Sequence, residues 1–211
     1  MCSSDLKLIS PAQEQDDPDQ EVEGLGLFAA MDVVLVLDVS GSMADQNPQT
    51  GKTLLSYAQD ASISFARTLF ALSPESRVGI VAYETIAWPV AGLTDRQGRQ
   101  SLFSLIRGIS WGGMTNTGDG FLKADDMLTS QAEAGRAQLV LMLTDGIANE
   151  GGSDPKQYAI DRGTDLAAHS LVYTVGMLGN YSAENLSYVR ETLHAGYETR
   201  YFEITFSDME E

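Results

Sequence analysis

The sequence predicts a doubly wound α/β domain, in which helices cover both faces of a mostly parallel sheet of six strands. Three observations lead to this fold class. Short apolar runs such as Val33–Leu37 are typical of parallel strands that are buried on both faces. Segments with apolar residues at helical spacing lie between these runs. Clusters of turn-forming residues separate the two kinds of segment, so strands and helices alternate along the chain.

The first half of the chain is expected to supply three strands and two helices. Val33–Leu37 forms the first strand, and a helix follows over residues 53–72, where apolar positions recur at helical spacing. Arg77–Tyr83 is the second strand. Thr85–Val90 is the third, and it belongs on the sheet edge because its proline cannot donate to a strand ladder. The short turn before it makes the third strand antiparallel to the second. A second helix is expected around Leu102–Ile109.

The second half continues the alternation and ends on a strand. The expected elements, in chain order, are a helix from the glycine-rich loop 111–118 to about Ala134, a strand over Gln138–Leu143, a helix capped by Asp154 that runs to about His169, a strand over Leu171–Val175, a helix from Ser182 to just before Gly196, and a strand over Arg200–Phe206. The common order 3-2-1-4-5-6 of such a Rossmann-like sheet places the first and fourth strands side by side.

Charge and composition exclude several classes of function. The 211 residues carry a formal net charge of −17, with 30 acidic and 13 basic side chains. Nucleic acids and anionic membranes need a basic face, so neither is an expected partner. No apolar stretch reaches the roughly 18 residues that a transmembrane helix needs, so direct membrane insertion is not expected. The single cysteine, Cys2, cannot form an internal disulfide.

The chain divides into a polar start, one folded domain and a short acidic end. Residues 1–28 are acidic and broken by proline, and we interpret them as a disordered linker or an artefactual N-terminus. The segment Met1–Asp5 resembles both the start of a mature bacterial lipoprotein and the translation of a sequencing adapter. Residues 29–207 are expected to form the folded domain, and 208–211 an acidic tail. We expect the chain to be part of a larger prokaryotic protein or assembly.

Oxygen-bearing side chains gather where two neighbouring strands are expected to end. Asp38, Ser40 and Ser42 follow the first strand at alternate positions, and Asp145 follows the fourth. Ligands bind beyond the carboxyl ends of such strands, and the loop that carries Thr115 arrives beside this point. Two carboxylates in one cleft repel each other unless a cation or hydrogen bonds lie between them. Carboxylates and hydroxyls suit Mg²⁺, Mn²⁺ or Ca²⁺ rather than zinc or copper.

The chain resembles the von Willebrand factor type A (VWA) domain family over roughly residues 30–206, through the three parts of its metal-ion-dependent adhesion site (MIDAS). The matching segments are Asp38-Val39-Ser40-Gly41-Ser42, Gly112-Gly113-Met114-Thr115-Asn116-Thr117-Gly118 and Thr144-Asp145-Gly146. The resemblance implies a complete MIDAS, with Ser40, Ser42 and Thr115 as hydroxyl ligands. Asp38 and Asp145 would hold the ion directly or through ordered waters. The family usually has a small residue and then leucine at Gly120-Phe121, a difference that concerns helix packing.

The resemblance also implies a function. Members of the family typically bind a divalent cation and leave one coordination position for a Glu or Asp carboxylate of a partner. We therefore expect a cation-dependent protein-binding module for adhesion or assembly, and not an enzyme. The expected partner is a protein that presents Asp or Glu. A cell-surface or secreted location is favoured over a cytoplasmic one.

An NTPase is the main alternative. Residues 46–53 nearly match the phosphate-binding G-x-x-x-x-G-K-[ST] pattern and run into a predicted helix. Gly51-Lys52-Thr53 would then contact the phosphates, and Asp145 would bind magnesium. However, this chain has Gln46 where the pattern begins with glycine. That glycine is what lets the backbone wrap around the phosphates. The segment also starts well after the first strand instead of at its end.

Two further alternatives concern single residues of the same loops. Haloacid dehalogenase-like hydrolases would use Asp38 as a nucleophile, but they need a second aspartate as general acid where this chain has Ser40. Serine, threonine and aspartate side chains also cap helices without binding any ligand. Helix capping is the expected role of Thr117, at the start of the helix after the glycine-rich loop.

Overall fold

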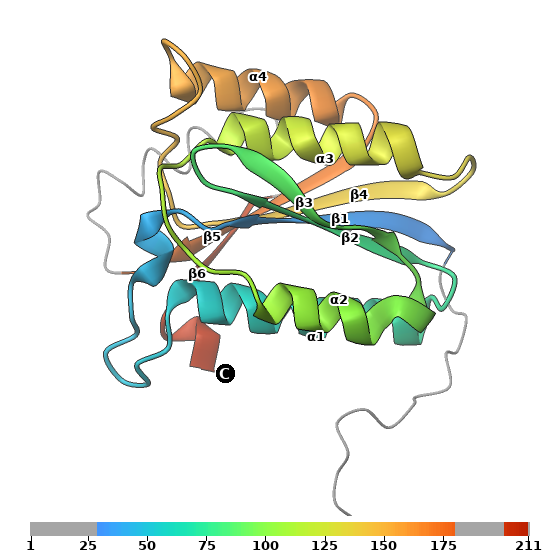
Figure 1. Cartoon of the computed structure of the whole chain (residues 1–211), viewed down its shortest axis with the longest axis horizontal. Coiled ribbons are helices and arrows are strands. Elements are labelled where there is room, and N and C mark those ends of the chain that lie inside the picture. Colours follow the sequence, from blue (N-terminus) through green and yellow to red (C-terminus); the bar gives the residue numbers. More distant parts are fainter. Residues whose placement is uncertain (1–28, 180–200, 211) are drawn as a thin grey trace, which may run out of the picture.

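The strands form one six-stranded sheet in the predicted order, β3-β2-β1-β4-β5-β6. The computed structural model describes residues 29–179 and 201–210 (Figure 1). β2 and β3 are antiparallel and the other neighbouring strands are parallel, which confirms the expected fold class. The strands are β1 (Met31–Asp38), β2 (Arg77–Tyr83), β3 (Ala87–Thr94), β4 (Ala137–Thr144), β5 (Leu171–Leu178) and β6 (Tyr201–Thr205).

Helices cover both faces of the sheet (Figure 1). One face carries α1 and α2, and the other carries α3 and α4. Their bounds are α1 (Leu54–Leu72), α2 (Arg99–Arg107), α3 (Thr117–Gln131) and α4 (Pro155–Ala167). The helix that we expected from Ser182 lies outside the described residues. Within the described residues, none of the helices combines the length and apolarity needed to cross a membrane.

The continuous apolar run of β1 follows from its central place. Val33, Leu35 and Leu37 pack in the core on the α1 and α2 side, whereas Val34 and Val36 pack in the core on the α3 and α4 side. Successive side chains of a strand point to opposite faces, so a strand covered twice must be apolar at every position. The run ends at Asp38, the last residue of β1, which is itself buried.

Side-chain caps set the starts of α1, α3 and α4. Thr53 accepts a hydrogen bond from the Ser56 amide at the start of α1. Asp154 caps α4 as predicted, with proline in the first turn. The prediction that Thr117 caps α3 is wrong, because the side chain of Asn116 accepts the amide of Asp119 and Thr117 is the first helical residue. An Asn amide oxygen is one of the preferred N-cap acceptors.

The third strand is on the sheet edge and antiparallel, as predicted, but its bounds differ from the expected Thr85–Val90. Residues 84–86 form the turn instead, where the Glu84 amide donates to Ile86 O (3.0 Å). The strand then continues past Pro89, with register shifts against β2 on the way. A shift of this kind lets an edge strand contain a proline without losing its pairing.

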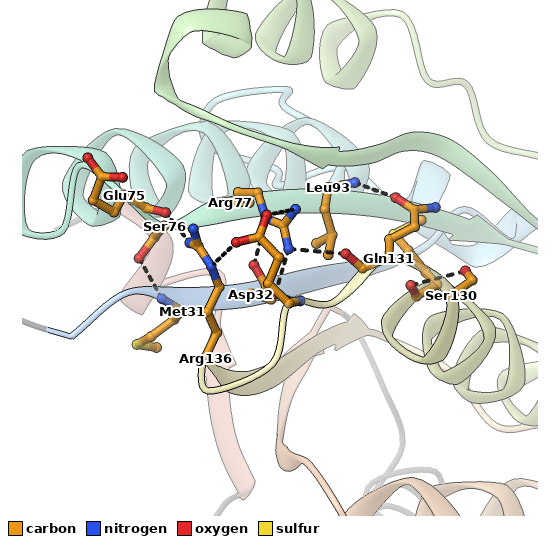
Figure 2. Close-up of polar contacts among 11 residues, drawn as sticks. Met31, Asp32, Glu75, Ser76, Arg77, Leu93, Ser130, Gln131 and Arg136 are labelled. Carbon is orange, nitrogen blue, oxygen red and sulfur yellow. Dashed lines mark hydrogen bonds and ion pairs between the residues drawn. The ribbon is translucent and has the colours of Figure 1, made fainter.

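A part-buried ion pair joins the amino-terminal ends of β1 and β2, away from the carboxyl edge of the sheet (Figure 2). Arg77 Nε and Nη2 donate to the two carboxylate oxygens of Asp32 over 2.8 and 2.7 Å. The Glu133 amide, in the α3–β4 loop, donates to the same carboxylate over 2.9 Å. Asp32 and Arg77 are paired in the sheet register, and the same register places Asp38 beside Tyr83 at the carboxyl edge. The pair therefore helps to fix which residues meet at that edge.

Candidate metal centre

Two aspartates lie at the carboxyl edge of the sheet because β1 and β4 are parallel neighbours. β1 ends at Asp38, and Asp145 follows directly after the last residue of β4. The register pairs Leu37 with Leu143, so the two strands end at the same level. Both aspartates are fully buried. The topology thus brings together carboxylates that are distant in sequence, at the place where open α/β sheets bind ligands.

Asp38 is held by donors from three segments. Its Oδ1 accepts the Ser40 amide (2.8 Å), and its Oδ2 accepts the hydroxyls of Thr144 (2.7 Å) and Tyr83 (3.2 Å). Burial raises the pKa of Asp38, although the hydrogen bonds from Ser40, Thr144 and Tyr83 oppose that rise. The orientation of this carboxylate is therefore fixed before any ligand arrives.

Ser40, Ser42 and Asp145 form a connected group beside it. The Ser42 hydroxyl donates to Asp145 Oδ1 over 2.9 Å, and the Ser40 and Ser42 hydroxyl oxygens are 3.2 Å apart. The two serines alternate with Gly41 at the start of a short 3-10 turn (Gly41–Ala44). The contact between the two hydroxyls places them on the same side of the loop, and Ser42 reaches the residue that follows β4.

Thr115 joins this group through the space beside Gly146. A Cβ atom added at Gly146 would lie 3.5 Å from Asp38 Oδ2 and 3.6 Å from Thr115 Oγ1. The Thr115 methyl carbon is nearer still, at 3.3 Å, so the Thr115 side chain and the Asp38 carboxylate both approach Gly146. The Thr115 backbone is fixed from both sides, since its amide donates to Asn149 Oδ1 (2.8 Å) and its carbonyl accepts the Asn149 amide (3.0 Å).

The glycine-rich loop is bound directly to the loop after β1. Gly41 N–H donates to Gly113 O (3.2 Å), and Gly112 N–H donates to Val39 O (2.8 Å). Gly113 has a φ of +67°, and a Cβ there would collide with the carboxylate of Glu84. The left-handed backbone favours glycine at position 113, whereas the Glu84 carboxylate is the end of a flexible side chain and could move aside.

All five residues predicted to bind the ion, Asp38, Ser40, Ser42, Thr115 and Asp145, belong to one connected region. Within the described parts of the chain, no three carboxylate, imidazole or thiol side chains gather as a metal cluster. The region instead combines two carboxylates with hydroxyls. Sequence reasoning placed Thr144 in the third matching segment but gave it no role, although its hydroxyl holds Asp38. It missed Tyr83 and Asn149, which position Asp38 and Thr115.

The comparison with protein families identifies the fold. The family model of the von Willebrand factor type A domain matches residues 32–210. The chain belongs to the von Willebrand factor type A domain family. The residues matched include β1 from its second residue, β4 and all three segments of the candidate metal centre.

This VWA domain is similar to part of inter-alpha-trypsin inhibitor heavy chain H3. It is 25% identical to the Homo sapiens protein over 187 residues, which is 84% of this chain and 20% of the relative. The Mesocricetus auratus protein is 28% identical over 154 residues, or 70% of this chain and 16% of the relative. The chain thus spans about a fifth, or less, of the length of the curated relatives it matches.

Solved structures show the same fold at low sequence identity. The von Willebrand factor type A structure from Catenulispora acidiphila gives a TM-score of 0.65 at 17% identity, covering 86% of this chain and 40% of that one. The vWF domain of the type V pili tip protein Mfa5 from Porphyromonas gingivalis gives a TM-score of 0.64 at 15% identity. The match covers 86% of this chain and 93% of that chain. The PilB minor pilin from Streptococcus sanguinis gives a TM-score of 0.63 at 15% identity. The match covers 86% of this chain and 58% of that chain.

The near match to a phosphate-binding loop folds differently. Asn47 N–H donates to Lys52 O (2.9 Å) and Gly51 N–H donates to Asn47 O (2.8 Å), so residues 46–53 form a closed turn. A phosphate loop needs such amides to face the phosphates. Lys52 Nζ is 3.3 Å from Asp60 Oδ2 and lies over the ring of Tyr57. The NTPase alternative is therefore not supported by the structure.

Proposed function

We propose that this VWA domain binds a divalent cation through Asp38, Ser40, Ser42, Thr115 and Asp145, and binds a protein partner through that cation. The observation that supports the proposal most is the hydrogen bond between Ser42 and Asp145, which joins the loop after β1 to the residue after β4. Asp38 Oδ2 and Thr115 Oγ1 both lie within 3.6 Å of the Cβ position of residue 146, next to Asp145.

The chemistry of the residues fits a hard cation. Asp38 and Asp145 are fully buried carboxylates at the ends of neighbouring strands. Like charges at such a place are stabilised when a cation lies between them. Oxygen donors, with no thiolate or imidazole among the five proposed ligands, favour Mg²⁺, Mn²⁺ or Ca²⁺. A bound ion with few charged ligands would remain attractive to an Asp or Glu side chain of a partner.

The biological setting that we propose is adhesion or assembly in a larger protein. The structural relatives include a pilus tip protein and a minor pilin, and the curated relatives are several times longer than this chain. We therefore propose a bacterial protein at the cell surface or in the extracellular space, with the VWA domain over residues 29–207. The site has no catalytic role in this proposal, and the net charge of −17 disfavours nucleic acid as a partner.

Ion binding is tested by titration calorimetry with Mg²⁺ and Mn²⁺. We expect one site in the wild-type protein, with binding lost in Asp145→Ala. Asp126→Ala is the matched control, because Asp126 is an exposed aspartate on α3. Equal ion binding by Asp145→Ala and the wild-type protein would refute the proposed site. The partner step is tested separately, since a complex that survives EDTA does not depend on the ion.

A further inference from the structure

A tyrosine at the start of α4 is bonded to the start of α3. The two helices lie side by side on one face of the sheet (Figure 1). Tyr158 is half-buried in the first turn of α4, and its hydroxyl donates to Asp119 Oδ1 over 2.9 Å. Asp119 is the third residue of α3, whose cap, Asn116, directly follows the proposed ion ligand Thr115. The hydroxyl of Tyr158 thus reaches the turn that begins beside the candidate metal centre.

Two glycines make room for the ring of Tyr158. A Cβ atom added at Gly118, in the first turn of α3, would overlap the ring. One added at Gly151, in the β4–α4 loop (residues 145–154), would lie 2.6 Å from Tyr158 Cδ1. Real Cβ atoms do not come that close to another atom, so a side chain at either position would need the ring to move. The ring therefore contacts both the β4–α4 loop and α3.

The same loop holds the backbone of Thr115. Asn149 binds that backbone in both directions, since its side-chain oxygen accepts the Thr115 amide and its own amide donates to the Thr115 carbonyl. Gly151 follows two residues later, and a Cβ there would lie 2.9 Å from Oδ1 of Asn116, which caps α3. The contact of Tyr158 with the loop is therefore made next to the residues that fix Thr115.

The β4–α4 loop depends on such contacts for its course. It begins at the proposed ligand Asp145 and ends at Asp154, the cap of α4. Gly151 and Gly152 have φ values of +122° and +96°. Glycine reaches such angles easily, but it loses more conformational freedom on folding than other residues do, so contacts with the rest of the domain have to offset that cost. A loop held in one course presents Asp145 and Thr115 together.

We propose that Tyr158 is a positioning residue for the proposed ion site, because it holds the β4–α4 loop against α3 in the arrangement that presents Thr115 and Asp145. It acts through that loop and does not bind the ion itself. This inference rests on the proposed function, because it concerns how the same site is controlled. Coupling between two sites is reciprocal, so ion binding should in turn stabilise the contacts of Tyr158. The start of α4 is thereby a second place, apart from the ligands, where the affinity for the ion can be changed.

Calorimetric titration with Mn²⁺ compares two replacements of Tyr158. Tyr158→Ala removes the ring from Gly118 and Gly151 and should weaken Mn²⁺ binding at least about tenfold, which corresponds to about 1.4 kcal/mol. Tyr158→Phe keeps the ring and loses only the bond to Asp119, so it should retain most of the affinity that the alanine variant loses.

Tyr173→Ala is the matched control. Tyr173 is also half-buried, but it lies within β5 and stacks on Phe202, with 6.2 Å between the ring centroids. Its loss should lower the stability to urea without changing the Mn²⁺ affinity. This control separates the positioning of the ligands from a general loosening of the fold.

A second readout measures the reciprocal effect in the wild-type protein, by hydrogen exchange and mass spectrometry. The amide of Tyr158 donates to Asp154 O over 3.0 Å, so it exchanges with solvent when the start of α4 opens. If that opening disturbs the ion site, saturating Mn²⁺ should slow exchange at residues 156–160 by a factor of at least about ten. Exchange in α2, on the other face of the sheet, should slow less (Figure 1).

The outcomes separate this inference from the proposed function. Wild-type Mn²⁺ affinity in Tyr158→Ala would overturn the inference and leave the proposed function intact. An equal loss of affinity in Tyr173→Ala would also overturn it, because the effect would then come from general destabilisation. If Tyr158→Ala does not fold, the exchange experiment decides, and exchange that Mn²⁺ slows no more at the start of α4 than in α2 would overturn the inference. Absence of Mn²⁺ binding by the wild-type protein would overturn the proposed function, and the inference with it.

Discussion

The Ser42 hydroxyl donates a hydrogen bond to Asp145 Oδ1 over 2.9 Å, although the two residues are 103 positions apart in the chain. The contact exists because β1 and β4 are parallel neighbours whose carboxyl ends lie at the same level. It links the loop after β1 to the residue after β4. Any ligand between the two strand ends therefore meets groups from both loops at once.

Replacement of Ser42 by alanine should weaken ion binding and also lower stability. The change removes one proposed ligand and one hydrogen bond to Asp145, and such a bond contributes about 1.5–3 kcal/mol when one partner is charged. Loss of a direct ligand should reduce Mn²⁺ affinity at least about tenfold, or about 1.4 kcal/mol. Calorimetry gives the affinity and urea unfolding gives the stability. Ser101→Ala, on the exposed surface of α2, should change neither.

Two substitutions of Thr115 separate its hydroxyl from its shape. Thr115→Val keeps the side-chain volume but removes the hydroxyl oxygen beside Gly146, so Mn²⁺ binding should be lost while the protein stays folded. Thr115→Ser keeps the oxygen and should retain most of the affinity. Thermal shift with and without Mn²⁺ measures both, because a bound ion raises the melting temperature. If the valine variant shows the full shift, the hydroxyl is not a ligand.

The fold could be predicted because its main signals are local. The unbroken apolar run of β1 indicates that this strand is buried on both faces of the sheet. The proline in the third strand indicates that this strand lies at the edge of the sheet. Strand order then follows from general rules for doubly wound sheets. The expected bounds of the third strand were wrong because the β2–β3 turn is set by contacts of Glu84 and Thr85 with the glycine-rich loop. Such contacts between distant segments leave no local pattern.

The proposed ligands could be located from sequence, but not the residues that orient them. Asp38 and Asp145 follow apolar strands, so the topology places them together. The sequence predicts Tyr83 only as the last residue of a strand. Its hydroxyl reaches Asp38 because the two residues are paired in register. Asn149 is in a loop without a recognisable motif, and its role depends on the fold of that loop around Thr115.

Enlargement of Gly120 should destabilise the domain through Tyr83. A Cβ at position 120 would lie 2.8 Å from the Tyr83 ring, whose hydroxyl donates to Asp38. We expect Gly120→Ala to cost about 1–3 kcal/mol by overpacking, only partly offset by the helix propensity of alanine, about 1 kcal/mol. Gly112→Ala is the control, because a Cβ there meets nothing within 4 Å. Chemical denaturation of both variants measures the difference, and equal stabilities would show that Tyr83 can move aside.

Loss of the Asp32 charge should destabilise the domain at neutral pH. Asp32 is fully buried and accepts hydrogen bonds from Arg77 and the Glu133 amide (Figure 2). Hydrogen bonds that involve charged groups contribute about 1.5–3 kcal/mol, so Asp32→Asn should lower the free energy of unfolding by about that amount. Asp126→Asn breaks only an exposed pair with Lys123 and should change stability by less than about 1 kcal/mol.

The same pair should make stability depend on pH in the acid range. Burial alone would raise the pKa of Asp32, but the hydrogen bonds from Arg77 and Glu133, with the charges of Arg77 and Arg136, outweigh burial and lower it. The folded state therefore binds this proton less readily than the unfolded chain does. The contribution of Asp32 is complete above the unfolded pKa of about 3.9 and is lost as the pH falls through the lower folded value.

The wild-type protein and Asp32→Asn should thus differ most in unfolding free energy near pH 7. The difference should shrink as the pH falls below about 4, because the carboxyl group of the wild-type protein then becomes neutral as well. Urea unfolding of both proteins at pH 7, 5, 4 and 3 measures this convergence. If the difference stays constant down to the lowest pH, the charge of Asp32 is not the source of its stabilising effect. Hydrogen bonding that does not depend on that charge would then be the source.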